Sequence, residues 1–326
     1  MTYRRLDADP DPELVRRVTA VPFLPDGTCA VLPDPPRLPS GPVRPGEHWL
    51  LDTCLRMPLE VAGYRMQRAH PVALDGTELY VWLAGDRYRG RRPHAEVALR
   101  AADPGTVAGW LAAAGRPAQA TAVRDAASSY AADDDARWFA DAERLLEPAY
   151  LRADTVEGGS GFGGTPEQWR ARRIGVLAGI EHDGTFLDLG CANGLLMESV
   201  HRWAGERGLA IEPYGVDLAP GLVALARRRL PRWADRIEVG NALTYAPGRR
   251  FDYVHVLLDA VPPHRRRELV DHARGLVAPG GRLLVSHYLH EGSTDRPVAT
   301  QLTELGRPPD GVDATAQTAW LTGYFC

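Results

Sequence analysis

A short segment near the middle of the chain combines residue types that bind nucleotides. It runs from Thr185 to Met197 and has the pattern of an apolar strand, a glycine turn and the start of a helix, with glycine at 190 and 194. Glycine lets the backbone approach a ligand closely, and a helix N-terminus presents free N–H groups and the positive end of its dipole. A strand, a glycine loop and a helix in this order form a nucleotide-binding unit.

Polar side chains follow the next apolar runs at intervals that suit such a site. Asp217 ends the second run, Asn241 and Ala242 follow the third, Asp259 lies just beyond the fourth, and His287 ends the fifth. The carboxyl ends of parallel strands form the ligand crevice of an open α/β sheet. We therefore expect these residues to line one crevice.

The elements that must position these residues alternate between strand and helix. Such alternation predicts a doubly wound, mostly parallel sheet. Strands are predicted at about 185–189, 214–217, 237–242, 251–258 and 282–287, with helices at about 193–207, 220–231 and 262–277.

From about residue 165 to 326 the chain resembles a class I S-adenosyl-L-methionine (SAM)-dependent methyltransferase, a Rossmann-like α/β fold with a seven-stranded sheet. The run Asp188-Leu-Gly-Cys-Ala-Asn-Gly194 matches that family's D-x-G-x-x-x-G loop, and Leu276-Val-Ala-Pro-Gly-Gly281 matches the turn before its fifth strand. A Rossmann dehydrogenase, the rival interpretation, would carry G-x-G-x-x-G. Residue 192 is alanine, which favours the methyltransferase.

The resemblance implies SAM as the cofactor and assigns the residues that bind it. The glycine loop would hold the methionine moiety, Asp217 the ribose hydroxyls, and Asn241 the adenine amine, although the family usually has aspartate at that position. The residues expected to contact the cofactor are Asp188, Gly190, Cys191, Ala192, Asn193, Gly194, Asp217, Leu218, Asn241, Ala242, Leu257 and Phe162.

Two residues are candidates for a catalytic base. Asp259 and His287 follow strands at the predicted crevice, and a base assists methyl transfer to a hydroxyl or amine by about 10²–10⁴-fold. Asp259 has an alternative role as the cap of a helix that starts near Pro262. His255 lies in the middle of a strand and is predicted to be a core histidine.

The first 105 residues predict a small α+β domain. Two hairpins are expected around Pro25-Asp-Gly27 and Asp75-Gly76, with one helix-like segment at about 46–62. This region resembles a degenerate Nudix domain. The matching positions are Gly41, Glu47, Arg56, Glu60 and Gly63, and the segment Pro93-His-Ala-Glu-Val97 resembles one that often follows in that family.

The predicted Nudix-like site lacks the residues for metal chemistry. Two glutamate positions of the motif hold Met57 and Val61, and Pro58 is expected to interrupt the helix. Mg²⁺ requires oxygen ligands. Only two carboxylates of the motif, Glu47 and Glu60, are left to provide them. We therefore predict no metal site, and a role for this domain in binding, structure or dimerisation.

Residues 106–165 are predicted to form a helical bridge between the Nudix-like domain, 1–105, and the methyltransferase domain, 166–326. The bridge ends in a glycine-rich stretch, 157–165, which is not a Walker loop because no Gly-Lys-Ser/Thr follows. It fits either a flexible linker or a lid that carries Phe162 over the site.

The composition excludes several classes of protein. A net charge of −4 gives no basic field for nucleic acid, and no apolar run reaches the ~18 residues of a membrane helix. The N-terminus lacks the apolar core of a signal peptide, and four widely spaced cysteines form neither a disulfide framework nor a zinc site. A cytoplasmic protein is expected, and low lysine with abundant alanine, arginine, glycine and proline suggests a bacterial gene.

These observations predict methyl transfer from SAM to an oxygen or nitrogen atom of a small-molecule acceptor. Two alternatives stay open: a bifunctional Nudix hydrolase and methyltransferase, and a non-catalytic SAM-binding protein. No acceptor signature such as Asn-Pro-Pro-Tyr follows the fourth strand, where Leu258-Asp-Ala-Val261 stands instead. A homodimer is compatible with the sequence.

Overall fold

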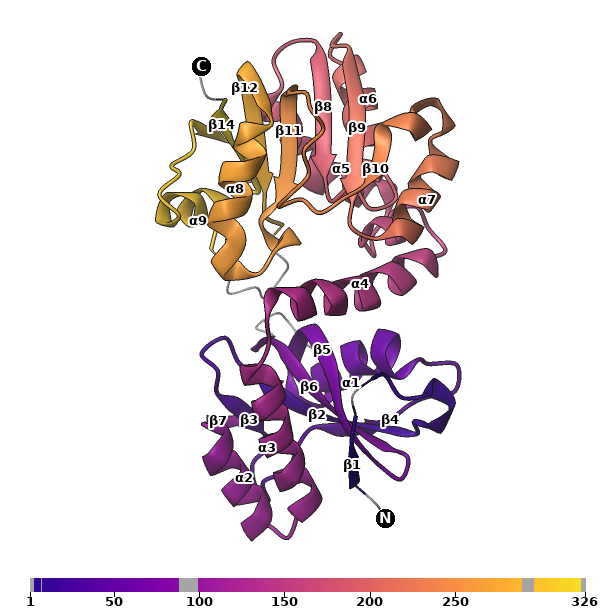
Figure 1. The fold of residues 1–326 in the computed structure, drawn as a ribbon, viewed down its shortest axis with the longest axis vertical. Coiled ribbons are helices and arrows are strands. Elements are labelled where there is room, and N and C mark those ends of the chain that lie inside the picture. Colours follow the sequence, from indigo (N-terminus) through magenta and orange to yellow (C-terminus); the bar gives the residue numbers. More distant parts are fainter. Residues whose placement is uncertain (1–2, 7, 88–98, 289–295, 324–326) are drawn as a thin grey trace. The chain divides into compact units, whose positions relative to one another are not determined.

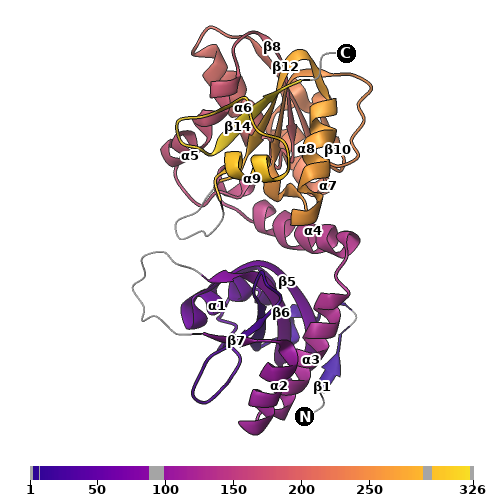
Figure 2. The ribbon, with the colours of Figure 1, turned by 90° about the vertical axis from the view of Figure 1, so that its left-hand side faces the viewer.

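A computed structural model describes residues 3–6, 8–87, 99–288 and 296–323. The chain divides after Leu145 into two compact units (Figures 1 and 2), to which we refer as the N-terminal and C-terminal units. No helix within the described ranges is long and apolar enough to cross a membrane.

The N-terminal unit is built on one mixed sheet with the order β1-β5-β6-β2-β3-β7, in which β4 also pairs with β2. Strands β2 and β6 are parallel, and the other pairs are antiparallel. Both expected hairpins form, with Gly27 and Gly76 at positive φ in the turns. The strands are β1 (Tyr3–Arg5), β2 (Arg17–Phe23), β3 (Cys29–Val31), β4 (Ser40–Pro42), β5 (Tyr64–Asp75), β6 (Glu78–Arg87) and β7 (Arg100–Ala102).

The predicted helix at 46–62 forms, but Pro58 does not break it. A π-helical turn, Trp49–Thr53, leads into helix α1 (Cys54–Ala62), which continues through Pro58 to Gly63 in the left-handed conformation. Pro58 is the fifth residue of α1, so its missing N–H removes only the hydrogen bond to the carbonyl of Cys54. The expected interruption was therefore wrong.

The segment expected as a bridge, 106–165, is shared between the units. Helices α2 (Pro104–Ala113) and α3 (Pro117–Ala131) bury Leu111 and Val123 in the core of the N-terminal sheet, against residues that include Trp82. Helix α4 (Asp135–Leu151) spans the division after Leu145. Apolar faces on α2 and α3 make these helices part of the first unit, because they need the sheet to be buried.

The C-terminal unit contains the predicted doubly wound sheet, with the order β10-β9-β8-β11-β12-β14-β13. The first five strands in this order are parallel, and β14 is antiparallel to both its neighbours. The strands are β8 (Gly184–Leu189), β9 (Ile211–Asp217), β10 (Ile237–Val239), β11 (Phe251–Leu257), β12 (Val277–Ser286), β13 (Gly311–Val312) and β14 (Thr318–Thr322).

The fifth strand begins earlier than expected. Pairing of Phe251 with Val277 and of Tyr253 with Arg282 places the Ala278–Gly281 turn inside β12 as an irregularity. A Cβ on Gly281 would lie 2.3 Å from the carbonyl oxygen of Asp252, so only glycine fits this approach. The glycine turn therefore joins the two parts of one strand.

The helices that alternate with the strands along the chain pack against the sheet. Helix α8 lies over β11 and β12 (Figure 1), and α5, α6 and α7 share one core that includes Phe186, Trp203 and Tyr253. The helices are α5 (Pro166–Arg173), α6 (Leu195–Gly205), α7 (Pro220–Arg229), α8 (Arg266–Gly275) and α9 (Val298–Glu304).

Trp82 tests the core of the N-terminal unit. Its ring is fully buried, and its Nε1 donates to Ser129 Oγ at 3.1 Å. We expect Trp82→Ala to lower the free energy of unfolding by about 3–5 kcal/mol, measured by urea denaturation followed by circular dichroism. Leu14→Ala, at a side chain that is 53% exposed, is the control and should change it by less than about 0.5 kcal/mol. A loss below about 1 kcal/mol for Trp82→Ala would contradict this assignment of the core.

Candidate active site at the carboxyl ends of the parallel strands

The glycine loop after β8 turns back over the end of β9. The N–H groups of Gly190 and Cys191 both donate to the carbonyl of Val216, at 2.7 and 2.9 Å. Gly190, Ala192 and Gly194 have φ values of 90°, 47° and 79°, in the left-handed region that favours glycine. No heavy atom lies within 4 Å of a Cβ placed on Gly190. The backbone of the loop at Gly190 therefore faces open space among the described residues.

Asp217 holds this loop in place. Its Oδ2 accepts from the N–H of Ala192 at 2.7 Å, and its Oδ1 accepts from the N–H of Ala219 at 3.0 Å. One carboxylate thus joins the loop to the end of β9 and to the start of α7. Each carboxylate oxygen keeps a second acceptor position, which is what a ribose hydroxyl would need. Burial raises the pKa of Asp217.

Asn193 is a buried positioning residue. Its Nδ2 donates to the carbonyl of Val156 at 2.7 Å, and its Oδ1 accepts from the N–H of Leu195 at 3.1 Å. The side chain expected to contact the cofactor is therefore committed to protein groups. It fastens Val156, the residue before the glycine-rich stretch, to the start of α6.

The glycine-rich stretch forms a packed turn. The N–H of Phe162 donates to the carbonyl of Glu157 at 2.9 Å, and the Phe162 ring meets Trp169 edge-on at 5.8 Å between centroids. Gly161 has a positive φ, and a Cβ there would lie 2.2 Å from Tyr150 Oη. These contacts do not fit a flexible linker, which was one of the two expected roles.

Asp188 belongs to a buried polar chain that crosses four strands. His255 Nδ1 lies 2.8 Å from Asp188 Oδ1, His255 Nε2 lies 3.0 Å from Ser286 Oγ, and Ser286 Oγ lies 2.9 Å from Thr318 Oγ1. A His255 ring that donates from Nδ1 and accepts at Nε2 satisfies both contacts. His255 is thus the core histidine that was predicted. Asp188, expected at the cofactor, has one oxygen engaged by this histidine.

The other expected cofactor residues lie at the same edge of the sheet. Asn241 follows β10, but its Oδ1 already accepts from the N–H of Leu243 at 2.9 Å. Cys191 is buried, and burial raises the pKa of its thiol, so the thiol stays protonated. Ala242 also follows β10, Leu218 follows β9, and Leu257 is the last residue of β11.

A cationic and aromatic cluster, which was not predicted from the sequence, lies beside these strand ends. The Arg173 guanidinium carbon sits 3.4 Å from the Tyr288 ring centroid and 4.9 Å from that of Trp169. Arg173 Nη1 is buried, with no hydrogen-bond partner among the described residues. Arg173 also interacts electrostatically with Asp259 and Tyr150, and burial lowers its pKa. Burial raises the pKa of Tyr150 to about 12.

The two candidate bases differ in exposure. Asp259 is exposed, whereas His287 is buried and its backbone N–H donates to the carbonyl of Gln317 at 2.9 Å. The helical turns that start at Pro263 and Arg266 have no side-chain cap. The alternative role of Asp259 as a cap is therefore not realised.

The charged residues of the Nudix-like pattern form ion pairs with one another in the N-terminal unit. Arg56 binds Glu47 at 2.7 Å and Glu60 at 2.9 Å, and the pairing with Arg56 lowers the pKa of Glu47 to about 2. Met57 is fully buried. Among the described residues no three His, Cys, Asp or Glu side chains form a group that could hold a metal. The segment 93–97 lies outside the described residues.

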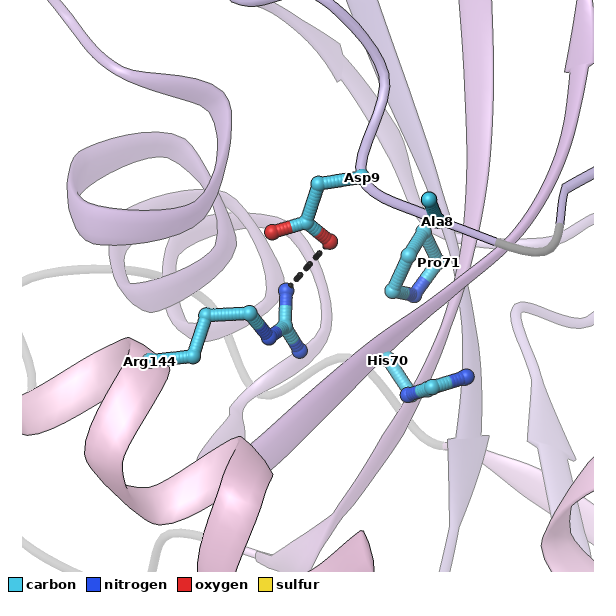
Figure 3. Close-up of a pocket in the computed structure, with 5 residues that line it drawn as sticks. All are labelled: Ala8, Asp9, His70, Pro71 and Arg144. Carbon is cyan, nitrogen blue, oxygen red and sulfur yellow. Dashed lines mark hydrogen bonds and ion pairs between the residues drawn. The ribbon is translucent and has the colours of Figure 1, made fainter.

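The same unit has a cavity of about 290 Å³, and the charged side chains around it also pair with one another. Arg144 pairs with Asp9 at 2.7 Å (Figure 3) and with buried Asp141 at 3.0 Å, and Asp141 also contacts His70 and Arg68. The cations around this cavity thus have carboxylate partners from their own chain. We regard this network as structural.

A family model described as "Methyltransferase domain" matches residues 186–281, from β8 to the glycine turn of β12. Residues 186–281 are thus similar to a methyltransferase domain. The matched segment contains the glycine loop, Asp217 and Asn241, which supports SAM as the cofactor of this domain. It leaves the N-terminal unit unassigned, so the Nudix-like resemblance stays a hypothesis.

Similarity to individual proteins covers part of the chain. A trans-aconitate 2-methyltransferase from Methylobacterium radiotolerans is 35% identical over 101 residues, which is 30% of this chain and 36% of that enzyme. A SAM-bound amino pentose methyltransferase from Micromonospora echinaspora is 26% identical over 41% of this chain and 56% of its own, with a TM-score of 0.32. The SAM-bound magnesium protoporphyrin IX methyltransferase of Synechocystis PCC 6803 is 16% identical over 60% and 99% of the two chains, with a TM-score of 0.42.

The buried polar chain predicts unequal effects of two substitutions at Asp188. Asp188→Ala leaves His255 Nδ1 buried without its acceptor, and should cost about 1–3 kcal/mol of unfolding free energy. Asp188→Asn keeps a side-chain oxygen that can accept the same hydrogen bond, and should cost less. Urea denaturation of both variants measures the difference. Equal losses would contradict a role for this hydrogen bond in stability.

Proposed function

We propose that the chain transfers a methyl group from SAM to an oxygen or nitrogen atom of a small-molecule acceptor. The observation that carries this proposal is the glycine loop fastened to Asp217. It lies at the end of β8, beside β11, where the order of the parallel strands reverses. Open α/β sheets bind their ligands at such a switch point.

The residues at this edge fit the parts of the cofactor. The loop from Gly190 to Gly194 offers backbone to the amino-acid part, and Gly194 provides no side-chain cap at the start of α6. Asp217 has acceptor positions left for ribose hydroxyls, and we assign Asn241, which follows β10, to the recognition of adenine. When bound, SAM would supply a methyl group whose carbon a nucleophile attacks, while the carbon–sulfur bond breaks and S-adenosylhomocysteine leaves as a neutral thioether. The protein aligns the two, and alignment contributes much of the rate.

The acceptor would bind beside the cofactor, near Asp259, Arg173 and Tyr288. The exposed carboxylate of Asp259 can take the proton of a hydroxyl or amine. The unsatisfied N–H group of Arg173 favours an acceptor that carries an oxyanion or carboxylate. The name of the trans-aconitate enzyme, whose substrate is a carboxylate, agrees with this preference.

Isothermal titration calorimetry with SAM tests the cofactor assignment. We expect saturable binding to the intact chain and a loss of about tenfold or more in affinity for Asp217→Ala, because a charged hydrogen-bond acceptor is removed. Asp235→Ala, an exposed aspartate in the same unit, is the matched control and should bind normally. Absence of binding to the intact chain would overturn the assignment.

Methyl-labelled SAM with a panel of carboxylic, hydroxyl and amine acceptors tests for catalysis. Product formation would exclude a non-catalytic SAM-binding protein. We expect Asp259→Asn or His287→Ala to lower turnover by about 10²–10⁴-fold while SAM affinity is retained, as for loss of a base. If both variants turn over normally, neither residue is the base.

The raised pKa of Asp217 predicts how SAM binding depends on pH. Ribose hydroxyls donate to the ionised carboxylate, so the dissociation constant should rise as the pH falls through a pKa above that of an ordinary aspartate. Without SAM the folded state holds this proton more tightly than the unfolded chain. The resulting stabilisation is full below the ordinary pKa and is lost as the pH rises through the raised one.

Titrations of the wild type and Asp217→Asn between roughly pH 4 and 7 check the pH dependence of binding. The variant has no ionisable group at this position, and its SAM affinity should be flat across the range. An identical pH profile in both proteins would show that another group is responsible.

A further inference from the structure

A second cavity in the N-terminal unit has a volume of about 450 Å³. Its arginines, unlike Arg144 in the first cavity, are not balanced by an equal number of carboxylates. A cavity of this size falls within the range of small-molecule sites. Its residues come from the starts of β2, β4, β6 and α3, the segment between β3 and β4, and the end of α1. They are Arg17, Leu32, Arg37, Leu38, Ser40, Val61, Glu78, Arg116 and Gln119.

The three arginines of this cavity have no carboxylate partner within the part of the chain that the structure describes. Among the described residues none of Arg17, Arg37 and Arg116 forms an ion pair, although Arg17 Nη1 donates to Ser40 Oγ at 3.2 Å. Arg116 Nε is buried and has no hydrogen-bond partner in the same part of the chain. Unsatisfied buried donors are costly, so this nitrogen is suited to a ligand acceptor.

Glu78, the one acid among the described residues that line the cavity, is already engaged. Glu78 accepts a hydrogen bond from Thr19 Oγ1, which in turn lies 2.8 Å from Ser40 Oγ. Three guanidinium groups therefore face one carboxylate, and the lining keeps an excess of positive charge. Around Arg144, by contrast, Asp9 and Asp141 balance the cations.

The start of α3 adds to the positive potential. This helix has fifteen residues and begins with Pro117 after Arg116, which makes no side-chain cap. Gln119 in its first turn accepts from the N–H of Leu38 at 3.0 Å, which fixes the segment between β3 and β4 as a wall of the cavity. Free N–H groups and the helix dipole at this end favour an anion.

We propose that this arginine cavity binds a small molecule that carries a phosphate or diphosphate group. Guanidinium groups match phosphate oxygens in geometry and form strong charge-assisted hydrogen bonds with them. A phosphate offers several acceptor oxygens, enough to engage more than one arginine at once. Leu32, Leu38 and Val61 supply an apolar wall for the rest of such a ligand.

Calorimetry with sodium pyrophosphate on the full chain, at ionic strength held constant with sodium chloride, tests this site. We expect saturable binding that weakens about tenfold in Arg37→Gln and in Arg116→Gln, because each removes a hydrogen bond to a charged group. Arg124→Gln is the matched control, since it removes the same charge from an exposed position on the same helix. Its affinity should equal that of the wild type.

Arg37 is exposed, so Arg37→Gln tests the proposal even if Arg116→Gln fails to fold. Absence of saturable binding to the wild type overturns the proposal. Equal affinity in Arg37→Gln and the wild type, or equal weakening in Arg37→Gln and Arg124→Gln, overturns it as well. Tighter binding of citrate than of pyrophosphate would assign the cavity to a polycarboxylate and overturn the phosphate class.

Discussion

The candidate active site depends on one carboxylate, that of Asp217. It accepts hydrogen bonds from the backbone of the glycine loop and from the start of α7, so it holds three segments at one point of the sheet edge. The residues of the loop that have positive φ need this support, because an isolated chain would seldom adopt three such values in five residues. The same carboxylate is the group expected to bind ribose, which couples the shape of the loop to recognition of the cofactor.

The interior of the C-terminal sheet supports this edge with polar contacts as well as apolar packing. Asp188, His255 and Ser286 lie on adjacent strands and satisfy one another below the crevice. Beside the crevice Arg173 rests on the ring of Tyr288 and is left with an unsatisfied N–H group. The first group is satisfied by its own members, whereas the second keeps a buried donor with no partner among the described residues. This difference separates a structural network from a group that can bind an acceptor.

The N-terminal unit shows the same distinction. Glu47 and Glu60, the acids that the Nudix-like pattern would assign to a metal, are both bound by Arg56. Arg17, Arg37 and Arg116 have no such partners among the described residues and line one cavity. The charge available for binding in this unit is therefore positive. An anionic ligand suits it better than a divalent cation does.

The sequence by itself determined the features that depend on local chemistry. Alternating strand and helix patterns predicted the doubly wound sheet, glycine spacing predicted the loop at 190–194, and turn residues predicted both hairpins, because each depends on neighbours in the chain. Asp217 could be placed for the same reason, since it ends a strand of known direction.

Only the tertiary structure decided which distant side chains meet. The pairing of β8 with β11 set Asp188 beside His255, and packing of α5 against the sheet brought Arg173 to Tyr288, more than a hundred residues later in the chain. The arginine cavity likewise combines residues from five separate elements. Strand register and the burial of apolar faces fix these contacts. Both depend on residues far away in the chain, so the residues next to an arginine or an aspartate do not indicate its partner.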